Sequence, residues 1–437
     1  MSLASLTRRA GRGQRSVLGL QRAGVVYAFV LIVVVFEILT AGDGLEGLLS
    51  VANVRNILDQ SALDGVLVVP MTCLLITGNF DLSIGATAGL AAGVGLGAAN
   101  HAGSVLGFVA AMAVGLAVGL VNGGLVQWVG VNAFIVTLGT LTAVQGVLLI
   151  SSGGQTILAS GNEFANIGSG FWTLWRGVPV IAGVLALSAC AYLVWHDVLH
   201  RQPAAAGAAD GLALTAGCSG ALLLVVVGAF PGLLRESRET WIMLGYMAAV
   251  ALFLRYTVFG RRLYAVGGNA EAARLSGVRL ASYRVGAFVM CGLSAGFAGV
   301  LYAGKFGAVI PSALSTEELP VIAAAILGGT SLFGGSGYVV KSVLGVLILQ
   351  TLTNGFALLN MGANLQYLVQ GLVIIAAAAV YTVGGLRKRA TRRALEQASP
   401  PGGEQPSGQG MPAGGGATVP VAPPSGPSVL ASMASPE

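Results

Sequence analysis

The stretch Gly267-Gly-Asn-Ala-Glu-Ala-Ala-Arg-Leu-Ser-Gly277 is a short polar segment between two long apolar runs, near residues 241–258 and 285–304. Six arginines lie in it or beside it: Arg255, Arg261, Arg262, Arg274, Arg279 and Arg284. Positive charge in a short connection marks the cytoplasmic side of a membrane protein. We therefore expect residues 259–284 to form an inner loop and the flanking runs to cross a membrane.

The composition of the whole chain agrees with a membrane protein. Its 437 residues are 55% hydrophobic and only 9% charged, and the mean hydropathy is +0.81. A soluble globular domain carries about 25% charged residues, so it could not hide this much apolar surface. Within lipid, backbone polar groups must be satisfied inside each segment, so the apolar runs are expected to be helical.

The apolar runs predict an all-α, polytopic transmembrane bundle of about twelve spans (10–12). A span needs roughly 20 residues. Broken or short helices are expected near residues 78–85 and 320–337, where glycine-rich stretches interrupt the runs. The expected spans are 24–41, 60–78, 83–100, 104–127, 133–151, 179–195, 211–230, 241–258, 285–304, 319–333, 338–358 and 364–384.

The distribution of Lys and Arg predicts that both termini are cytoplasmic. Eighteen of the 23 Lys and Arg residues fall in the segments that this layout places inside. We divide the chain into a basic N-terminus (1–23), a transmembrane domain (24–385) and a basic, then disordered tail (386–437). The tail from Pro400 is rich in Pro, Gly and Ser and cannot bury a core. Anionic membrane lipid explains the basic residues at helix ends, so we do not expect nucleic acid to be a partner.

Two segments on the predicted outer side are long enough to contact a partner. Residues 152–178 are polar and aromatic, and residues 305–318 are shorter. They either dock a protein outside the membrane or are interfacial loops with aromatic anchors.

Asp81 interrupts two apolar runs in the stretch Gly78-Asn-Phe-Asp-Leu-Ser-Ile-Gly85. A carboxylate at this depth is costly unless it caps a helix, pairs or faces water. One interpretation is a helix break that lines a transport route, with Asn79, Asp81 and Ser83 in it. The other is a plain N-cap of the next helix.

Other side chains suit the wall of a sugar path. Phe134 and Thr137 put an aromatic ring and a hydroxyl on one helix, and Asn354 is a comparable candidate. Helix packing through Thr and Gly explains the same residues. The chain has no P-loop, no motif of a hydrolase and no cluster of metal-ligand spacing, so we expect neither an enzyme nor a metal or cofactor site.

Five stretches, in order, resemble the permease subunits of ribose/xylose-type ATP-binding-cassette sugar importers. They are Gly78–Gly85, Phe134–Thr140, Gly267–Gly277, Ala323–Gly337 and Gln366–Leu372. The resemblance covers most of residues 50–385. Three spans within residues 179–258, where ribose-type members have one, make the layout similar to the xylose type.

The resemblance implies a mechanism and a set of partners. Two permease copies would form the path, cytoplasmic ATP-binding subunits would drive it, and an extracytoplasmic binding protein would deliver a monosaccharide, a pentose such as xylose. It implies an inner-membrane location. The ATPase-coupling residues would be Gly268, Asn269, Glu271, Ala272, Ala273 and Arg274.

Three alternatives stay open on the sequence alone. The same machinery could carry branched-chain amino acids or nucleosides. The chain could be a stand-alone secondary carrier, although it offers few Asp, Glu or His residues at depth for a proton relay. It could also be a membrane scaffold that transports nothing.

Overall fold

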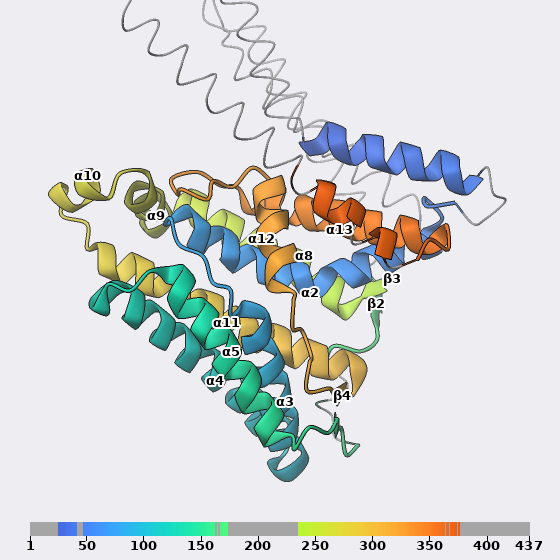
Figure 1. Ribbon diagram of the computed structural model, residues 1–437, viewed down its shortest axis with the longest axis horizontal. Coiled ribbons are helices and arrows are strands. Elements are labelled where there is room, and N and C mark those ends of the chain that lie inside the picture. Colours follow the sequence, from blue (N-terminus) through green and yellow to red (C-terminus); the bar gives the residue numbers. More distant parts are fainter. Residues whose placement is uncertain are drawn as a thin grey trace, which may run out of the picture. The chain divides into compact units, whose positions relative to one another are not determined.

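The computed structural model describes residues 25–41, 47–161, 164, 167–173, 235–362, 364–366, 368–373 and 375, and this part of the chain is mostly helical (Figure 1). The predicted spans at 179–195 and 211–230, the N-terminus and the tail lie outside the described residues, as does most of the predicted last span. The helices are Val25–Ala41, α2 (Val51–Ile76), α3 (Ile84–Ala102), α4 (Ser104–Gly124), α5 (Ala133–Ser151), α8 (Arg238–Tyr256), α9 (Val258–Gly268), α10 (Ala270–Leu275), α11 (Leu280–Phe306), α12 (Glu318–Leu327) and α13 (Val339–Leu358).

Five helices in the described part are long and apolar enough to cross a membrane, and a sixth span is possible if the bent pair α8 and α9 counts as one. The predicted span 133–151 coincides with α5. The helix that contains the span expected near 60–78 begins earlier, at Val51. Ser50 caps it by accepting the N–H of Asn53 at 3.3 Å, so the helix begins within a polar stretch that hydropathy alone does not mark.

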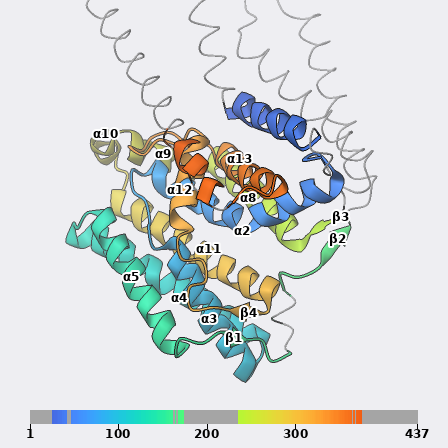
Figure 2. The same cartoon turned by 45° about the vertical axis from the view of Figure 1, so that its right-hand side comes forward.

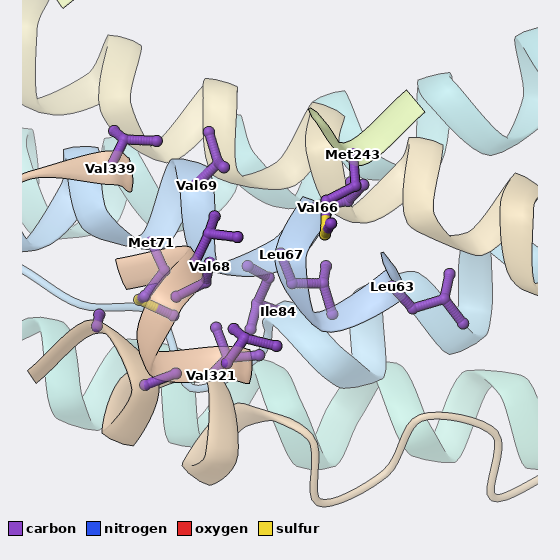
Figure 3. Close-up of a cluster of buried hydrophobic side chains, with 14 of the residues drawn as sticks. Leu63, Val66, Leu67, Val68, Val69, Met71, Ile84, Met243, Val321 and Val339 are labelled. Carbon is purple, nitrogen blue, oxygen red and sulfur yellow. The ribbon is translucent and has the colours of Figure 1, made fainter. Parts of the chain in front are cut away.

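The helix α2 is enclosed by protein, with every residue from Ser61 to Ile76 buried. Its side chains form the core together with Met243 of α8, Val321 of α12 and Val339 of α13 (Figure 3). A helix that is apolar on all sides suits a position surrounded by other helices as well as by lipid. Helices α8, α9, α11, α12 and α13 pack against α2, whereas α4 packs on α3 and α11.

The helices α4 and α11 approach each other through glycine. A Cβ on Gly115 would lie 2.1 Å from the carbonyl oxygen of Gly292, and one on Gly292 would lie equally close to the carbonyl of Gly115. Only glycine permits this separation, and it is the way transmembrane helices bring their backbones together. The glycine content of the chain is used here for helix packing.

Two short antiparallel ribbons modify the all-α expectation. Strand β1 (Ile157–Leu158) pairs with β4 (Ala308–Val309), and β2 (Phe171–Thr173) pairs with β3 (Arg235–Ser237). Both ribbons lie away from α10, at the other end of the described helices (Figures 1 and 2). We call the end with α9 and α10 the inner end and the end with the ribbons the outer end, following the predicted sides.

Residues 305–318 do not form the simple outer loop that was expected. Only their first part pairs with β1, and the chain then runs down α3 towards its first turn. A Cβ on Gly89 would lie 2.3 Å from the carbonyl oxygen of Ala313, and one on Gly85 would lie 2.5 Å from that of Leu314. Glycines in α3 therefore make room for this non-helical backbone, and the short helix α12 begins inside the bundle.

Candidate coupling and translocation site

The segment rich in arginine begins with a sharp bend. Helices α8 and α9 meet at 78° around Thr257, whose hydroxyl oxygen accepts the N–H of Gly260 at 3.1 Å. On α9, Leu263 and Val266 are buried on one face, while Arg261 and Arg262 are exposed. The bend turns the chain from a spanning direction into one along the inner end of the bundle.

The next helix, α10, is short and capped at both ends. Asn269 accepts the N–H of Ala272 at 3.0 Å. At the other end, Gly277 has φ +79° and donates to Arg274, while Val278 donates to Ala273. This is a Schellman motif, which satisfies the last carbonyls of a helix. The stretch Gly267–Gly277 therefore encodes one capped helix of defined length.

Most of the predicted coupling residues are exposed. Glu271 and Arg274 form an ion pair at 2.8 Å on the surface of α10, and Gly268, Asn269 and Ala272 are also exposed. Ala273 is buried, so its part would be to seat α10 on the bundle. The sequence reasoning missed Leu275, an apolar residue that is 79% exposed on the same short helix.

Close contacts hold α9, just before α10, against two other elements. The carbonyl oxygen of Ile76, at the end of α2, accepts the N–H of Gly335 at 2.9 Å. A Cβ on Gly267 would lie 1.7 Å from the same carbonyl oxygen. The Tyr264 hydroxyl donates to the carbonyl of Gly337 at 2.7 Å. The glycine-rich loop 328–337 is thus wedged between α9 and α2.

Asp81 belongs to a buried hydrogen-bonded group. Its Oδ1 accepts the backbone N–H of Ser83 at 2.8 Å and the Ser83 hydroxyl at 2.6 Å. Asn122 of α4 donates to Ser83 at 2.9 Å, and Thr140 of α5 donates to Asn122 at 2.7 Å. The N-cap of α3 is Ser83 rather than Asp81. We call Asp81, Ser83, Asn122 and Thr140 the Asp81 group; it ties the break before α3 to α4 and α5.

The other predicted path residues hydrogen-bond outside the Asp81 group, although Asn79 and Phe134 lie close to it. Phe134 is half exposed and meets Phe80 edge-on, with ring centroids 6.4 Å apart. The Thr137 hydroxyl bonds to its own helix at Ala133, and Asn79 bonds to Thr77. Asn354 is buried on α13, whereas the hydrogen bonds of Asp81 go to Ser83 and Asn122.

A second polar group lies near the middle of α2. Gln350 of α13 donates to Asp64 Oδ2 at 2.7 Å, and the carboxyl group of Glu317 is within hydrogen-bonding reach of Asp64. Sequence reasoning did not connect Asp64 with the other two. The Glu-Glu pair before the short apolar run at 319–333 was the available signal.

A family model described as the branched-chain amino acid transport system permease component matches residues 53–378. The chain belongs to this permease family. The match spans the bend, α10, the glycine-rich loop and both polar groups. No solved structure matches the chain.

Curated relatives of this permease are named for pentoses. The chain is 34% identical over 376 residues to the xylose transport system permease protein XylH of Escherichia coli K12, covering 82% of this chain and 91% of the relative. It is 30% identical over 361 residues to the ribose import permease protein RbsC of Bacillus subtilis, covering 82% and 92%. The likeness therefore extends over nearly the whole length of both relatives, which are transport permeases rather than enzymes.

The outer end of this permease carries a cluster of charges. Lys305 of α11 is 2.8 Å from Asp59 of α2 and 3.0 Å from Glu239 of α8. Glu236, in β3, lies 3.9 Å from Arg55. Burial raises the pKa of Glu236 to about 7, although the positive charge of Arg55 opposes the shift. We call Lys305, Asp59 and Glu239 the outer ion cluster; it joins three helices near the ribbons.

Proposed function

We propose that this chain is the permease subunit of an ATP-driven importer that moves a pentose, xylose in the first place, across the bacterial inner membrane. Its partners would be cytoplasmic ATP-binding subunits, an extracytoplasmic sugar-binding protein and a second copy of the chain. Hydrolysis would belong to the separate ATP-binding subunit. We further propose about twelve crossings, with both termini inside.

The observation that carries this proposal is the construction of α10. A helix of fewer than two turns has little stability of its own in water, and caps at both ends compensate for part of this. Here the capped helix presents Glu271, Arg274 and Leu275 to the outside of the bundle. Exposed charge around an apolar side chain is a typical protein-binding surface. An external motor could push on it without first ordering it.

The contacts beneath α10 support a route for that movement. Gly267 touches the end of α2, and Gly335 is bonded to the same carbonyl. The loop 328–337 also continues from α12, so a displacement of α9 would reach both α2 and the short helix. Phe333, which is 90% exposed in this loop, adds a second apolar contact for the motor. Packed elements with two arrangements transmit such displacements.

We propose that the translocation path runs beside the two buried polar groups. Asp81 and Ser83 would line its inner part with Asn79, Phe134 and Thr137, and Asn354 would lie further out. Buried polar residues in a spanning bundle usually mark such a path.

The alternative cargo has one point in its favour, which is the description of the family model. Relatives at 30% identity or more carry the names of xylose and ribose, and this favours the sugar. We find no comparable observation in the described residues that favours a stand-alone secondary carrier.

The test is to isolate the complex from its native membrane and measure binding by its extracytoplasmic subunit. We expect a co-purified ATP-binding subunit and a soluble protein that binds xylose. Isolation of a protein that binds leucine or a nucleoside instead would overturn the pentose assignment. Absence of an ATP-binding subunit from the complex would overturn the proposal that the chain belongs to an ATP-driven importer.

A further inference from the structure

We propose that Asp64, Glu317, Gln350 and Asn354 form the binding site for sugar hydroxyls at mid-depth of the bundle, a site distinct from the Asp81 group. The inference rests on the proposed sugar transport and names the residues that would hold the cargo. It begins with position: Asp64 is near the middle of α2, and Gln350 is near the middle of α13. Transport folds place their substrate near the middle of the bilayer.

The short helix α12 begins at the same place. Its first residue is Glu318, and the chain before it reaches this depth as irregular backbone along α3. Non-helical backbone at depth is tolerated where protein covers it or where it lines a cavity. Leu314 and Thr316 have φ of 55° and 87°, in a region that costs a non-glycine residue energy. Strain of this kind clusters at functional breaks.

The chemistry of the group suits a neutral ligand with many hydroxyls. Carboxylates accept hydrogen bonds from adjacent hydroxyl groups, and amides both donate and accept. Asp64 and Glu317 supply the carboxyl groups. Gln350 and Asn354 supply the amide groups. Two carboxyl groups within hydrogen-bonding reach of each other share a proton, so the pair can both accept from and donate to ligand hydroxyls.

One polar atom of the group has no partner. Asn354 is 6% exposed, and its Oδ1 accepts no hydrogen bond from the described residues. It lies one helical turn beyond Gln350, on the same face of α13. A buried acceptor without a partner costs about 1–3 kcal/mol, so a ligand hydroxyl donated to it would recover that cost.

The outer ion cluster lies next to the proposed site along α2. Asp59 precedes Asp64 on the same helix. The Lys305 ammonium group forms ion pairs with both Asp59 and Glu239, at 2.8 and 3.0 Å. The cluster joins α2, α8 and α11 on the outer side of the site. In this arrangement the site is closed towards the sugar-binding protein, and the cluster would have to part before sugar enters.

The test uses single cysteines in the complete complex, reconstituted with its ATP-binding and sugar-binding subunits. In a background lacking Cys73, Cys190, Cys218 and Cys291, Gln350→Cys and Asn354→Cys are treated with a small charged thiol reagent during turnover. Ser294→Cys serves as the control, because Ser294 is a buried polar residue bonded to Tyr246 elsewhere in the bundle. We expect xylose to slow labelling at positions 350 and 354 about tenfold and to leave position 294 unchanged.

Three outcomes overturn the inference. Labelling at 350 and 354 that xylose does not slow would do so, as would wild-type rates of xylose uptake by both cysteine variants. Protection by leucine or a nucleoside instead of xylose would reassign the site to another cargo.

A second variant separates this inference from the proposed function. Asp64→Asn should lower xylose uptake at least about tenfold, since a hydrogen bond to a charged group is lost. ATP hydrolysis stimulated by the loaded binding protein should persist, because α10 is untouched. If the wild-type complex moves no xylose, the proposed function fails. If wild type and Asp64→Asn move xylose equally, only the site is wrong.

Discussion

Gly335 donates its backbone N–H to the carbonyl oxygen of Ile76 at 2.9 Å, which fastens the loop between α12 and α13 to the end of α2. The end of α2 is therefore held by its neighbours as well as by its own ladder. A push on α10 would reach the central helix at this point.

Glu271→Lys should uncouple ATP hydrolysis from uptake. The substitution reverses the charge at the exposed end of α10 and replaces the ion pair with Arg274 by a repulsion. An exposed pair contributes under about 1 kcal/mol, so the protein should still fold. In proteoliposomes we expect uptake to fall at least about tenfold with normal assembly. His101→Lys, at an exposed position of the other end, is the matched control. Normal uptake by Glu271→Lys would reject the role of this surface.

Gly267→Val should destabilise the protein severely. Its Cβ would lie 1.7 Å from the carbonyl oxygen of Ile76, and neither backbone can move away without breaking the contact with Gly335. Forced overpacking costs about 1–3 kcal/mol or more. Gly245→Ala is the control, since nothing lies within 4 Å of its Cβ position. Thermal unfolding in detergent should separate the two, and equal midpoints would show that the contact is not tight.

Asn122→Leu should lower the thermal stability of the protein, because it breaks hydrogen bonds of the Asp81 group. It removes the donor to Ser83 and the acceptor of the Thr140 hydroxyl, both of which are buried or half-buried. The Thr140 hydroxyl keeps the Val136 carbonyl as an acceptor at 2.9 Å, so the main loss is the donor to Ser83. An unsatisfied buried group costs about 1–3 kcal/mol, so we expect a midpoint lower by a few degrees. Thr142→Val is the control, because the Thr142 hydroxyl is exposed and bonds only within its own helix. A loss no larger than that of the control would mean that the group adds no stability.

Glu236→Gln should remove a pH dependence at the outer ribbon. The pKa of Glu236 is about 7 in the folded protein against an ordinary value of 4.5, and burial is the main cause. Between these values the folded state holds a proton that the unfolded state has released. Stability is therefore greatest below pH 4.5 and falls as pH rises through about 7. From pH 5 to 8 the wild-type midpoint should fall relative to that of Glu236→Gln; parallel curves would contradict this.

The sequence predicted the helices that hydropathy and caps define. The span 133–151 and the polar stretch around Glu271 were located by composition and spacing, because both features are local. The start of α2 was missed since polar residues such as Arg55 and Asp59 lie in its first turns. Local patterns do not show that these charges are neutralised by Glu236 and Lys305, which are distant in the chain.

The sequence also could not predict that residues 308–317 run along α3. Gly85 and Gly89 could have been helix-packing residues, and only the fold shows that irregular backbone lies on them. The pairing of Gln350 with Asp64 depends on which faces of α13 and α2 meet. Such contacts follow from tertiary packing, so the sequence could not predict that Asp64 and Gln350 lie together.

ATP-dependent uptake of radiolabelled xylose into proteoliposomes tests the account most directly. Vesicles would hold either this chain alone or the chain with its ATP-binding subunit, with the sugar-binding protein outside and ATP supplied to the ATP-binding subunit's side. We predict accumulation only in the second preparation and only with hydrolysable ATP. Accumulation by the chain alone, or equal uptake with and without ATP, would contradict the account.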